Sequence, residues 1–156
     1  MNIVSVRPFK NYGPAMKLDD ARAPVDFARS VLIGESIEIY SDRLLTRFTY
    51  ISDTIIGYLK ALYYEKFDYF NIGMDHSKIT ISGLAKIFAE KGNEVFGHKT
   101  KFKYQTSKDK EYLTNNSRRR SPDIIKAKEK LNFFPRLESK DGVYRFLNNL
   151  KEEMVK

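Results

Sequence analysis

The sequence predicts an α/β fold, in which short buried strands alternate with amphipathic helices. Three observations lead to this prediction. Residues 2–6 (NIVSV) form a short apolar run of the kind found in buried parallel strands. Strand-like and helix-like periodicities then follow one another along the chain, separated by glycine and proline. At 156 residues, of which 42% are hydrophobic, the chain is long enough for one domain with a core.

The first predicted strand, residues 2–6, has no unit in front of it, so we expect the chain to start in the middle of a fold. Gly13 and Pro14 then turn the backbone into a loop. Residues 24–32 are predicted to form a helix that has Pro24 in its first turn and ends at Gly34. Its broad apolar face contains Val25, Phe27, Ala28, Val31 and Leu32.

The middle of the chain is predicted to contain three more strands and a helix. Residues 36–40 (SIEIY) alternate between polar and apolar, and residues 48–51 and 68–72 form further short strands. Between the last two, a helix is expected to start from a cap at Ser52 or Asp53 and to run to about Tyr63. Its buried stripe is expected to consist of Ile55, Ile56, Leu59 and Leu62.

Ser82 is expected to cap the next helix, which contains Leu84, Ile87 and Phe88 and is punctuated by Gly92 and Gly97. Residues 101–104 alternate, and their lysines would blunt the pairing of an edge strand.

Two helices are predicted near the end of the chain. Ser121-Pro122-Asp123 offers a capping hydroxyl, a proline and an acid, and it predicts a helix over residues 124–131. An amphipathic helix is predicted over residues 139–154, with inward side chains at Val143, Phe146, Leu147 and Leu150.

The composition excludes several classes of site. The chain has no cysteine, so it has neither a disulfide framework nor a thiolate metal site, and we expect a cytoplasmic protein with no metal. Its apolar runs are too short to cross a bilayer, so no membrane partner is expected. His76 and His98 lack a nearby acid or nucleophile motif, and a surface role is preferred for both.

Most of the net charge of +8 lies in one segment. Residues 99–130 contain eleven lysines and arginines against four acids, a net excess of seven. A concentrated positive patch attracts phosphates, whether on a nucleic acid or on a small nucleotide.

Three short segments follow one another in a fixed order: RPFKNYGP (residues 7–14), TRFTYISD (46–53) and RRRSPD (118–123). Together they resemble the C-terminal half of the NAD-dependent nucleotide-sugar epimerase/dehydratase family, the extended short-chain dehydrogenases. The likeness is greatest to UDP-glucuronate decarboxylase-like members. KLDD (17–20) and LNFFP (131–135) extend the resemblance over essentially the whole chain.

The resemblance implies that residues 1–156 form a single C-terminal substrate-binding domain. Such a domain would be an incomplete Rossmann fold, with the last part of the sheet and a small mixed α/β subdomain. The N-terminal NAD-binding Rossmann part is expected to be absent.

In the first segment, the family pattern Arg-Pro-Phe-Asn implies an asparagine that hydrogen-bonds the sugar diphosphate. Lys10 occupies that position here and Asn11 comes one place later, so both are candidate substrate-binding residues. A lysine can pair with a phosphate as a point charge but cannot accept a hydrogen bond. The alternative, preferred for this segment alone, is a tight turn made by Gly13 and Pro14.

In the second segment, the resemblance implies that Arg47 reaches the nucleotide phosphate. One residue is missing between Arg47 and Phe48 relative to the family, and a slip of one residue in a strand reverses the direction of its side chains. Either the preceding loop absorbs the deletion or Arg47 points away from the ligand. For Tyr50 and Asp53 we prefer strand packing and a helix cap.

In the third segment, alignment on Pro122 implies that Arg119 and Arg120 correspond to the family's arginines, one of which grips the diphosphate. Guanidinium groups beside a helix N-terminus form a favourable anion site. The alternative is a solvated basic turn.

The chain lacks the segments that would carry catalysis. It contains no Gly-x-x-Gly-x-x-Gly or Gly-x-Gly-x-x-Gly, so its cofactor-binding residues are unknown. Its Tyr-x-x-x-Lys, Tyr104 and Lys108, follows the other motifs and has no helical stripe, so we assign no catalytic residue. NAD is expected in the complete family enzyme, and no cofactor is expected on this chain alone.

We therefore expect the UDP- or dTDP-sugar-binding portion of an epimerase, dehydratase or decarboxylase of polysaccharide biosynthesis, truncated and inactive alone. A split enzyme with a separate N-terminal NAD-binding half is a second form of this hypothesis. The alternative is a small basic nucleic-acid-binding protein, with Phe102, Tyr104 and Tyr112 stacking on bases. A third hypothesis is that the chain is a scaffold or an assembly subunit.

Overall fold

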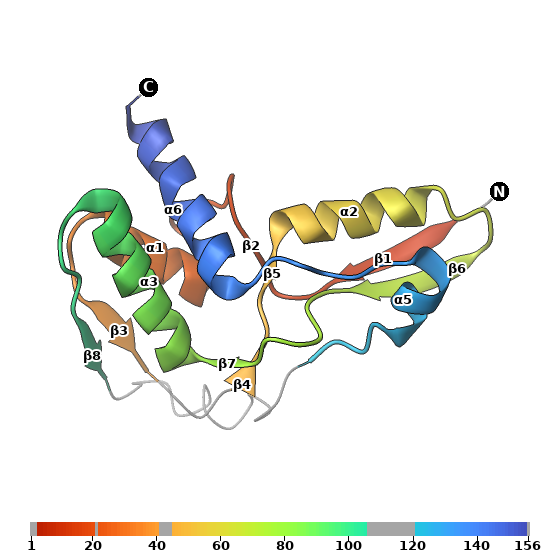
Figure 1. The fold of residues 1–156 in the computed structure, drawn as a ribbon, viewed down its shortest axis with the longest axis horizontal. Helices are drawn as coiled ribbons and strands as arrows, with labels where there is room; N and C mark the ends of the chain where they lie inside the picture. Colours follow the sequence, from red (N-terminus) through yellow and green to blue (C-terminus); the bar gives the residue numbers. More distant parts are fainter. Residues whose placement is uncertain (1–2, 21, 41–44, 106–120, 156) are drawn as a thin grey trace.

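A computed structural model describes residues 3–20, 22–40, 45–105 and 121–155. Helices α1, α3 and α6 gather at one end of an elongated molecule, and β1, β6, α2 and α5 form the other end (Figure 1). The elements in chain order are β1 (Val4–Pro8), β2 (Asn11–Tyr12), α1 (Ala23–Leu32), β3 (Ile37–Ile39), β4 (Leu45–Thr46), β5 (Thr49–Tyr50), α2 (Ile51–Leu62), β6 (Asp68–Ile72), β7 (Ile79–Thr80), α3 (Ile81–Phe96), β8 (Phe102–Tyr104), α5 (Ile125–Leu131) and α6 (Ser139–Met154).

The smaller end is built on a parallel pair of strands, β1 and β6, whose register runs from Val4 opposite Asp68 to Pro8 opposite Ile72. The predicted strands over residues 2–6 and 68–72 are confirmed, although the first begins two residues later than expected. One face of this pair is covered by α2 and α5. The apolar core there contains Phe70, Ile72, Ala61, Ile124, Ala127, Leu131 and Phe133.

The larger end contains the main core, where α3 packs between α1 and α6 and the parallel strands β3 and β8 lie alongside (Figure 1). The predicted inward residues of α6, namely Val143, Phe146, Leu147 and Leu150, are all buried. Gly92 does not interrupt α3. It lets α3 approach α1 closely, because a Cβ at Gly92 would collide with the side chain of Val31.

The helix starts differ from the predicted caps. The hydroxyl of Thr80, not that of Ser82, accepts a hydrogen bond from the backbone amide of Gly83 at the start of α3 (3.0 Å). Helix α2 begins at Ile51 after Tyr50, without a side-chain cap, so neither Ser52 nor Asp53 plays that role. At α5 the carboxylate of Asp123 accepts from the amide of Ile125 (3.0 Å) in place of the expected Ser121 hydroxyl.

The predicted buried stripe of α2 is wrong. Ile55, Leu59 and Leu62 are 49%, 52% and 76% exposed, whereas the small residues Gly57 and Ala61 face the strands. The reason is the close approach of the helix to β6, because a Cβ at Gly57 would lie 2.5 Å from Cγ2 of Ile72. Small side chains therefore hold the contact, and the large ones lie outside it.

Two short strand pairs join the ends of the molecule. β2 pairs in parallel with β5, and β4 pairs antiparallel with β7. The predicted strand over residues 48–51 is reduced to β5, because Ile51 already belongs to α2. No helix in the described ranges is long and apolar enough to cross a membrane.

Candidate functional site

The carboxyl ends of β1 and β6 lie side by side, and the segments that leave them form the candidate site. The amide of Phe9 donates to the carbonyl of Ile72 (2.9 Å), so both strands end at the same level. Gly73 follows at once, and a Cβ there would lie 2.8 Å from Cβ of Phe9 and 2.9 Å from Cγ of Pro122. Parts of the first and third sequence segments therefore meet at the edge where open α/β sheets place their ligands.

Thr49 brings the second segment to the same edge. This fully buried residue donates from Oγ1 to the carbonyl of Phe9 (2.8 Å) and accepts from the amide of Met74 (2.9 Å). It therefore joins the loops that follow β1 and β6. Sequence reasoning assigned Thr49 only to a strand, although its place inside the second segment was a signal of this role.

Lys10 and Asn11 follow β1 after Phe9, within this cluster. Lys10 has a positive φ of 44°, and its Nζ lies 5.4 Å from the ring centroid of Phe48. Asn11 begins β2, and its Oδ1 accepts from the hydroxyl of Thr54 (3.0 Å). The amide oxygen of Asn11 thus has a partner in the first turns of α2, and Lys10 brings a positive charge beside the second segment.

Arg47 reaches the loop after β6. Its side chain is 9% exposed, and its Nε donates to the carbonyl of His76 (2.9 Å). Within the described residues this guanidinium forms no ion pair with a carboxylate. A guanidinium has five N–H donors, so one bond to a carbonyl leaves donors for a further acceptor.

Arg119 and Arg120 lie outside the described residues, as do Tyr112 and Lys108. Tyr50 is buried, in keeping with its preferred role in strand packing, whereas Asp53 is buried but does not cap α2 as was preferred for it. Asp53 accepts from two backbone amides just before α6, those of Arg136 (3.0 Å) and Leu137 (2.9 Å).

Charged groups surround the loop after β6. Lys128 donates to one carboxylate oxygen of Asp75, and His76 Nδ1 lies 3.0 Å from the other. Burial alone would raise the pKa of Asp75, but the hydrogen bonds from Lys128 and His76 outweigh it and hold that pKa below its usual range. His76 is exposed, as expected, whereas His98 is half-buried and its Nε2 contacts the carbonyl of Val31 at 2.7 Å.

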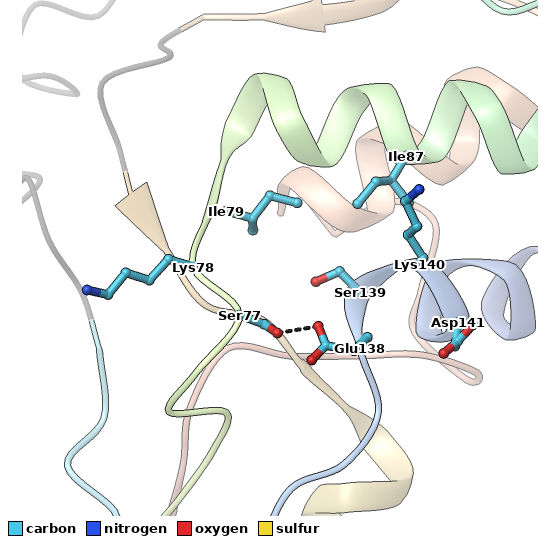
Figure 2. Close-up of a pocket in the computed structure, with 8 residues that line it drawn as sticks. All are labelled: Ser77, Lys78, Ile79, Ile87, Glu138, Ser139, Lys140 and Asp141. Carbon is cyan, nitrogen blue, oxygen red and sulfur yellow. Dashed lines mark hydrogen bonds between the residues drawn. The ribbon is translucent and has the colours of Figure 1, made fainter.

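A cavity of about 420 Å³ lies beside the candidate site, between α3 and the start of α6 (Figure 2). Ser77 donates to Glu138 at its rim, and Lys78 points away from the other labelled side chains. Lys10, Asn11 and Arg47, the predicted substrate-binding residues that the structure describes, do not line this cavity. We therefore place the candidate site at the ends of β1 and β6 and not in the cavity.

The described residues do not fit NAD. A dinucleotide site needs a strand that turns through glycines directly into a helix N-terminus, which cradles the pyrophosphate. Here β1 continues through Phe9 into β2, and β6 continues past Gly73 into β7. The described part of the chain also contains no group of three or more acidic or histidine side chains that could hold a metal ion.

No protein-family model matches the chain. It is similar in sequence to UDP-glucuronic acid decarboxylase 1 of Arabidopsis thaliana, with 29% identity over 96% of this chain and 32% of the relative. Decarboxylase 4 of the same plant is 30% identical over 95% of this chain and 31% of its own length. The chain thus spans about a third of these relatives.

Solved structures match the fold over nearly the whole chain. The UDP-glucose 4-epimerase of Thermotoga maritima, determined with UDP-glucose, has a TM-score of 0.80 at 22% identity, covering 97% of this chain and 46% of its own. The UDP-glucuronic acid 4-epimerase of Bacillus cereus, in complex with UDP-glucuronic acid and NAD, has a TM-score of 0.77 at 23% identity, covering 98% and 46%. The matched region is the C-terminal part of such chains, and these comparisons do not support the nucleic-acid-binding alternative.

Proposed function

We propose that this chain, whose sequence and fold match the C-terminal portion of the NAD-dependent nucleotide-sugar epimerase/dehydratase family, binds a nucleotide sugar at the ends of β1 and β6. The relatives described above are named as enzymes that act on UDP-sugars, and we extend that ligand class to this chain. In this proposal residues 1–156 act as one substrate-binding domain in the cytoplasm and do not catalyse a reaction on their own.

The observation that carries the proposal is the environment of Arg47. A charged side chain that is removed from water is costly unless a partner of opposite charge compensates it. Arg47 is 9% exposed, and among the described residues its guanidinium donates to the neutral carbonyl of His76 and forms no ion pair. The diphosphate of a nucleotide sugar would supply both the missing negative charge and acceptors for the remaining N–H groups.

Lys10 would place a second positive charge near the same ligand, because its Nζ lies beside the ring of Phe48, the residue that follows Arg47. We further propose Arg119 and Arg120 as diphosphate ligands and Asn11 as a residue that supports the site through Thr54. The chemistry at the sugar would require NAD, and because the described residues do not fit this cofactor, we assign NAD to a separate N-terminal half.

Titration calorimetry tests this function directly. UDP-glucuronic acid, UDP-glucose and dTDP-glucose are titrated into the purified chain, followed by UDP and free glucuronic acid. We expect saturable binding of at least one nucleotide sugar and of UDP, and no binding of the free sugar. Arg47→Met should weaken binding of the nucleotide sugar at least tenfold, since it removes a charge-assisted contact worth about 1.5–3 kcal/mol.

Arg29→Ala serves as the matched control, because Arg29 is an exposed cation on α1 that pairs with Asp26. Its affinity should remain within twofold of the parent chain. The proposal is wrong if none of the three nucleotide sugars binds saturably, or if Arg47→Met binds as well as the parent. Binding of duplex DNA that falls steeply with salt, without nucleotide-sugar binding, would instead favour the nucleic-acid alternative.

A further inference from the structure

The cavity between α3 and the start of α6 has an apolar side and a polar side (Figure 2). Ile79 and Ile87 form the apolar side, and both also pack against the main core. The first residues of α6 form much of the polar side. Its volume of about 420 Å³ falls within the range of small-molecule sites, which is about 300–1,000 Å³. A cavity of this size and lining suits a small ligand that has both an apolar and a charged part.

Ser139, the first residue of α6, places a buried hydroxyl in this cavity. The residue is 9% exposed, and its side chain points from the helix into the space between Ser77 and Ile79 (Figure 2). Its backbone carbonyl accepts a hydrogen bond from Tyr12, whereas its hydroxyl has no hydrogen-bond partner among the residues that the structure describes. A buried hydroxyl without a partner is costly. A ligand in the cavity would supply the missing partner.

The N-terminus of α6 adds further donors beside Ser139. Glu138 occupies the N-cap position but makes no side-chain cap. Its carboxylate instead accepts from the hydroxyl of Ser77, and one of its oxygens lies 3.6 Å from Nε2 of His76. The first amides of a helix have no partner inside the helix and carry a partial positive charge. With the Ser139 hydroxyl and the ammonium of Lys140, which also lines the cavity, they can hold a carboxylate.

The same wall also carries negative charge. The carboxylate of Asp141 lines the cavity, and within the described ranges it accepts no hydrogen bond and forms no ion pair. Lys78, in contrast, points away from the other labelled side chains (Figure 2). A dianion such as phosphate would be repelled by Glu138 and Asp141, and a simple amine would meet the positive end of the helix dipole. A molecule that carries both a carboxylate and an ammonium satisfies both kinds of group.

We propose that this cavity binds a free α-amino acid with an aliphatic side chain. Its carboxylate lies at the N-terminus of α6 against the Ser139 hydroxyl, its ammonium lies at Asp141, and its side chain packs on Ile79 and Ile87. The inference goes beyond the proposed function, because it concerns another ligand and other residues. It stands or falls independently of nucleotide-sugar binding.

Nuclear magnetic resonance titration of the purified chain, labelled in its backbone nitrogens and isoleucine methyl groups, tests the inference. Free leucine should cause saturable shifts of the amides of Ser139 and Lys140 and of the methyl groups of Ile79 and Ile87. Isocaproate lacks the ammonium, isoamylamine lacks the carboxylate, and glycine lacks the apolar side chain. Each should bind about tenfold more weakly than leucine or worse, because each loses one of the three contacts.

Two variants test the assigned contacts. Ser139→Ala and Asp141→Asn should each weaken leucine binding about tenfold, since each removes a charge-assisted contact. Ser5→Ala and Asp19→Asn are the matched controls at exposed positions and should leave the affinity within about twofold of the parent. The spectrum of each variant without ligand shows that it is folded.

The inference is overturned if leucine causes no saturable shift at the start of α6. It is also overturned if isocaproate, isoamylamine or glycine binds as tightly as leucine, or if Ser139→Ala and Asp141→Asn both bind like the parent. Since no nucleotide sugar is present in the titration, failure of the calorimetric test leaves this result unchanged. Failure of leucine binding likewise leaves the proposed function standing.

Discussion

The carboxylate of Asp53 accepts a hydrogen bond from the backbone amide of Leu137 across 2.9 Å. Asp53 lies in the first turn of α2, and Leu137 lies two residues before α6. The amide of Arg136 donates to the same oxygen. A single buried side chain therefore joins the smaller end of the molecule to the segment that leads into the main core.

Asp53→Ala should destabilise the chain by about 1.5–3 kcal/mol, because two backbone amides lose a charged acceptor. Urea unfolding followed by circular dichroism measures the change. Asp19→Ala removes an exposed carboxylate and should shift the free energy of unfolding by less than about 0.5 kcal/mol. Equal stability of the two variants would show that the bonds of Asp53 contribute nothing to the fold.

Gly92→Ala should destabilise the chain although alanine is the better helix former. In an exposed helix this change would gain about 0.5–1 kcal/mol. Here the added methyl group would collide with Val31 between α3 and α1, and overpacking costs typically about 1–3 kcal/mol. Val31→Ala should relieve the collision, so the double variant should be more stable than the sum of the single changes predicts. Thermal unfolding of the four proteins measures this coupling, and strict additivity would contradict it.

The stability of the chain should fall at acid pH in part through Asp75. Its pKa is lowered in the folded protein, so folding favours the ionised carboxylate. This contribution is present above the unfolded pKa of about 4 and is lost as the pH falls through the lower folded pKa. Asp75→Asn should flatten the decline of the urea midpoint between about pH 5 and about pH 2, the range that brackets the reference pKa of an aspartate. Lys128→Met removes the donor and should have the same effect, whereas Asp19→Asn should leave the profile of the parent unchanged.

Arg47→Met should leave the unliganded chain as stable as the parent or make it more stable, by roughly 1 kcal/mol, because it removes a buried charge that pairs with no acid among the described residues. The same variant should lose nucleotide-sugar binding. Urea unfolding with and without UDP-glucuronic acid separates the two effects. A large loss of stability without ligand would mean that Arg47 serves the fold and not the site.

The sequence predicted the strands and helices with clear periodicity. The ranges of β6 and α6 agree with those expected, and so do the buried residues of α6. Strands β2, β4 and β7 contain two residues each, too few to show alternation, and none was predicted. The face of α2 was assigned wrongly because large apolar residues were expected to point inward, whereas Gly57 and Ala61 allow the close approach to β6.

The candidate site was predicted in outline through the order of its three segments. The resemblance of the first two segments to the family identified the charged candidates Lys10 and Arg47, which the fold brings to one region. The resemblance did not identify Thr49, because a buried hydroxyl that joins two loops has no signal in the sequence beyond its place inside the second segment. The His76 carbonyl that holds Arg47 could not be predicted either, since a backbone acceptor depends only on how the chain is placed.

The parallel pairing of the strands has a consequence for how quickly the chain folds. Val4 pairs with Asp68 and Ile37 with Phe102, so the two longest ladders join residues far apart in the sequence, and no hairpin joins consecutive strands among the described residues. Loops of this length must close before either ladder gains any hydrogen bond, and such topologies fold slowly. During synthesis on the ribosome, β3 cannot pair until β8 has emerged. Helices α1 and α3 both precede β8 in the chain, so they can pack together before β8 emerges.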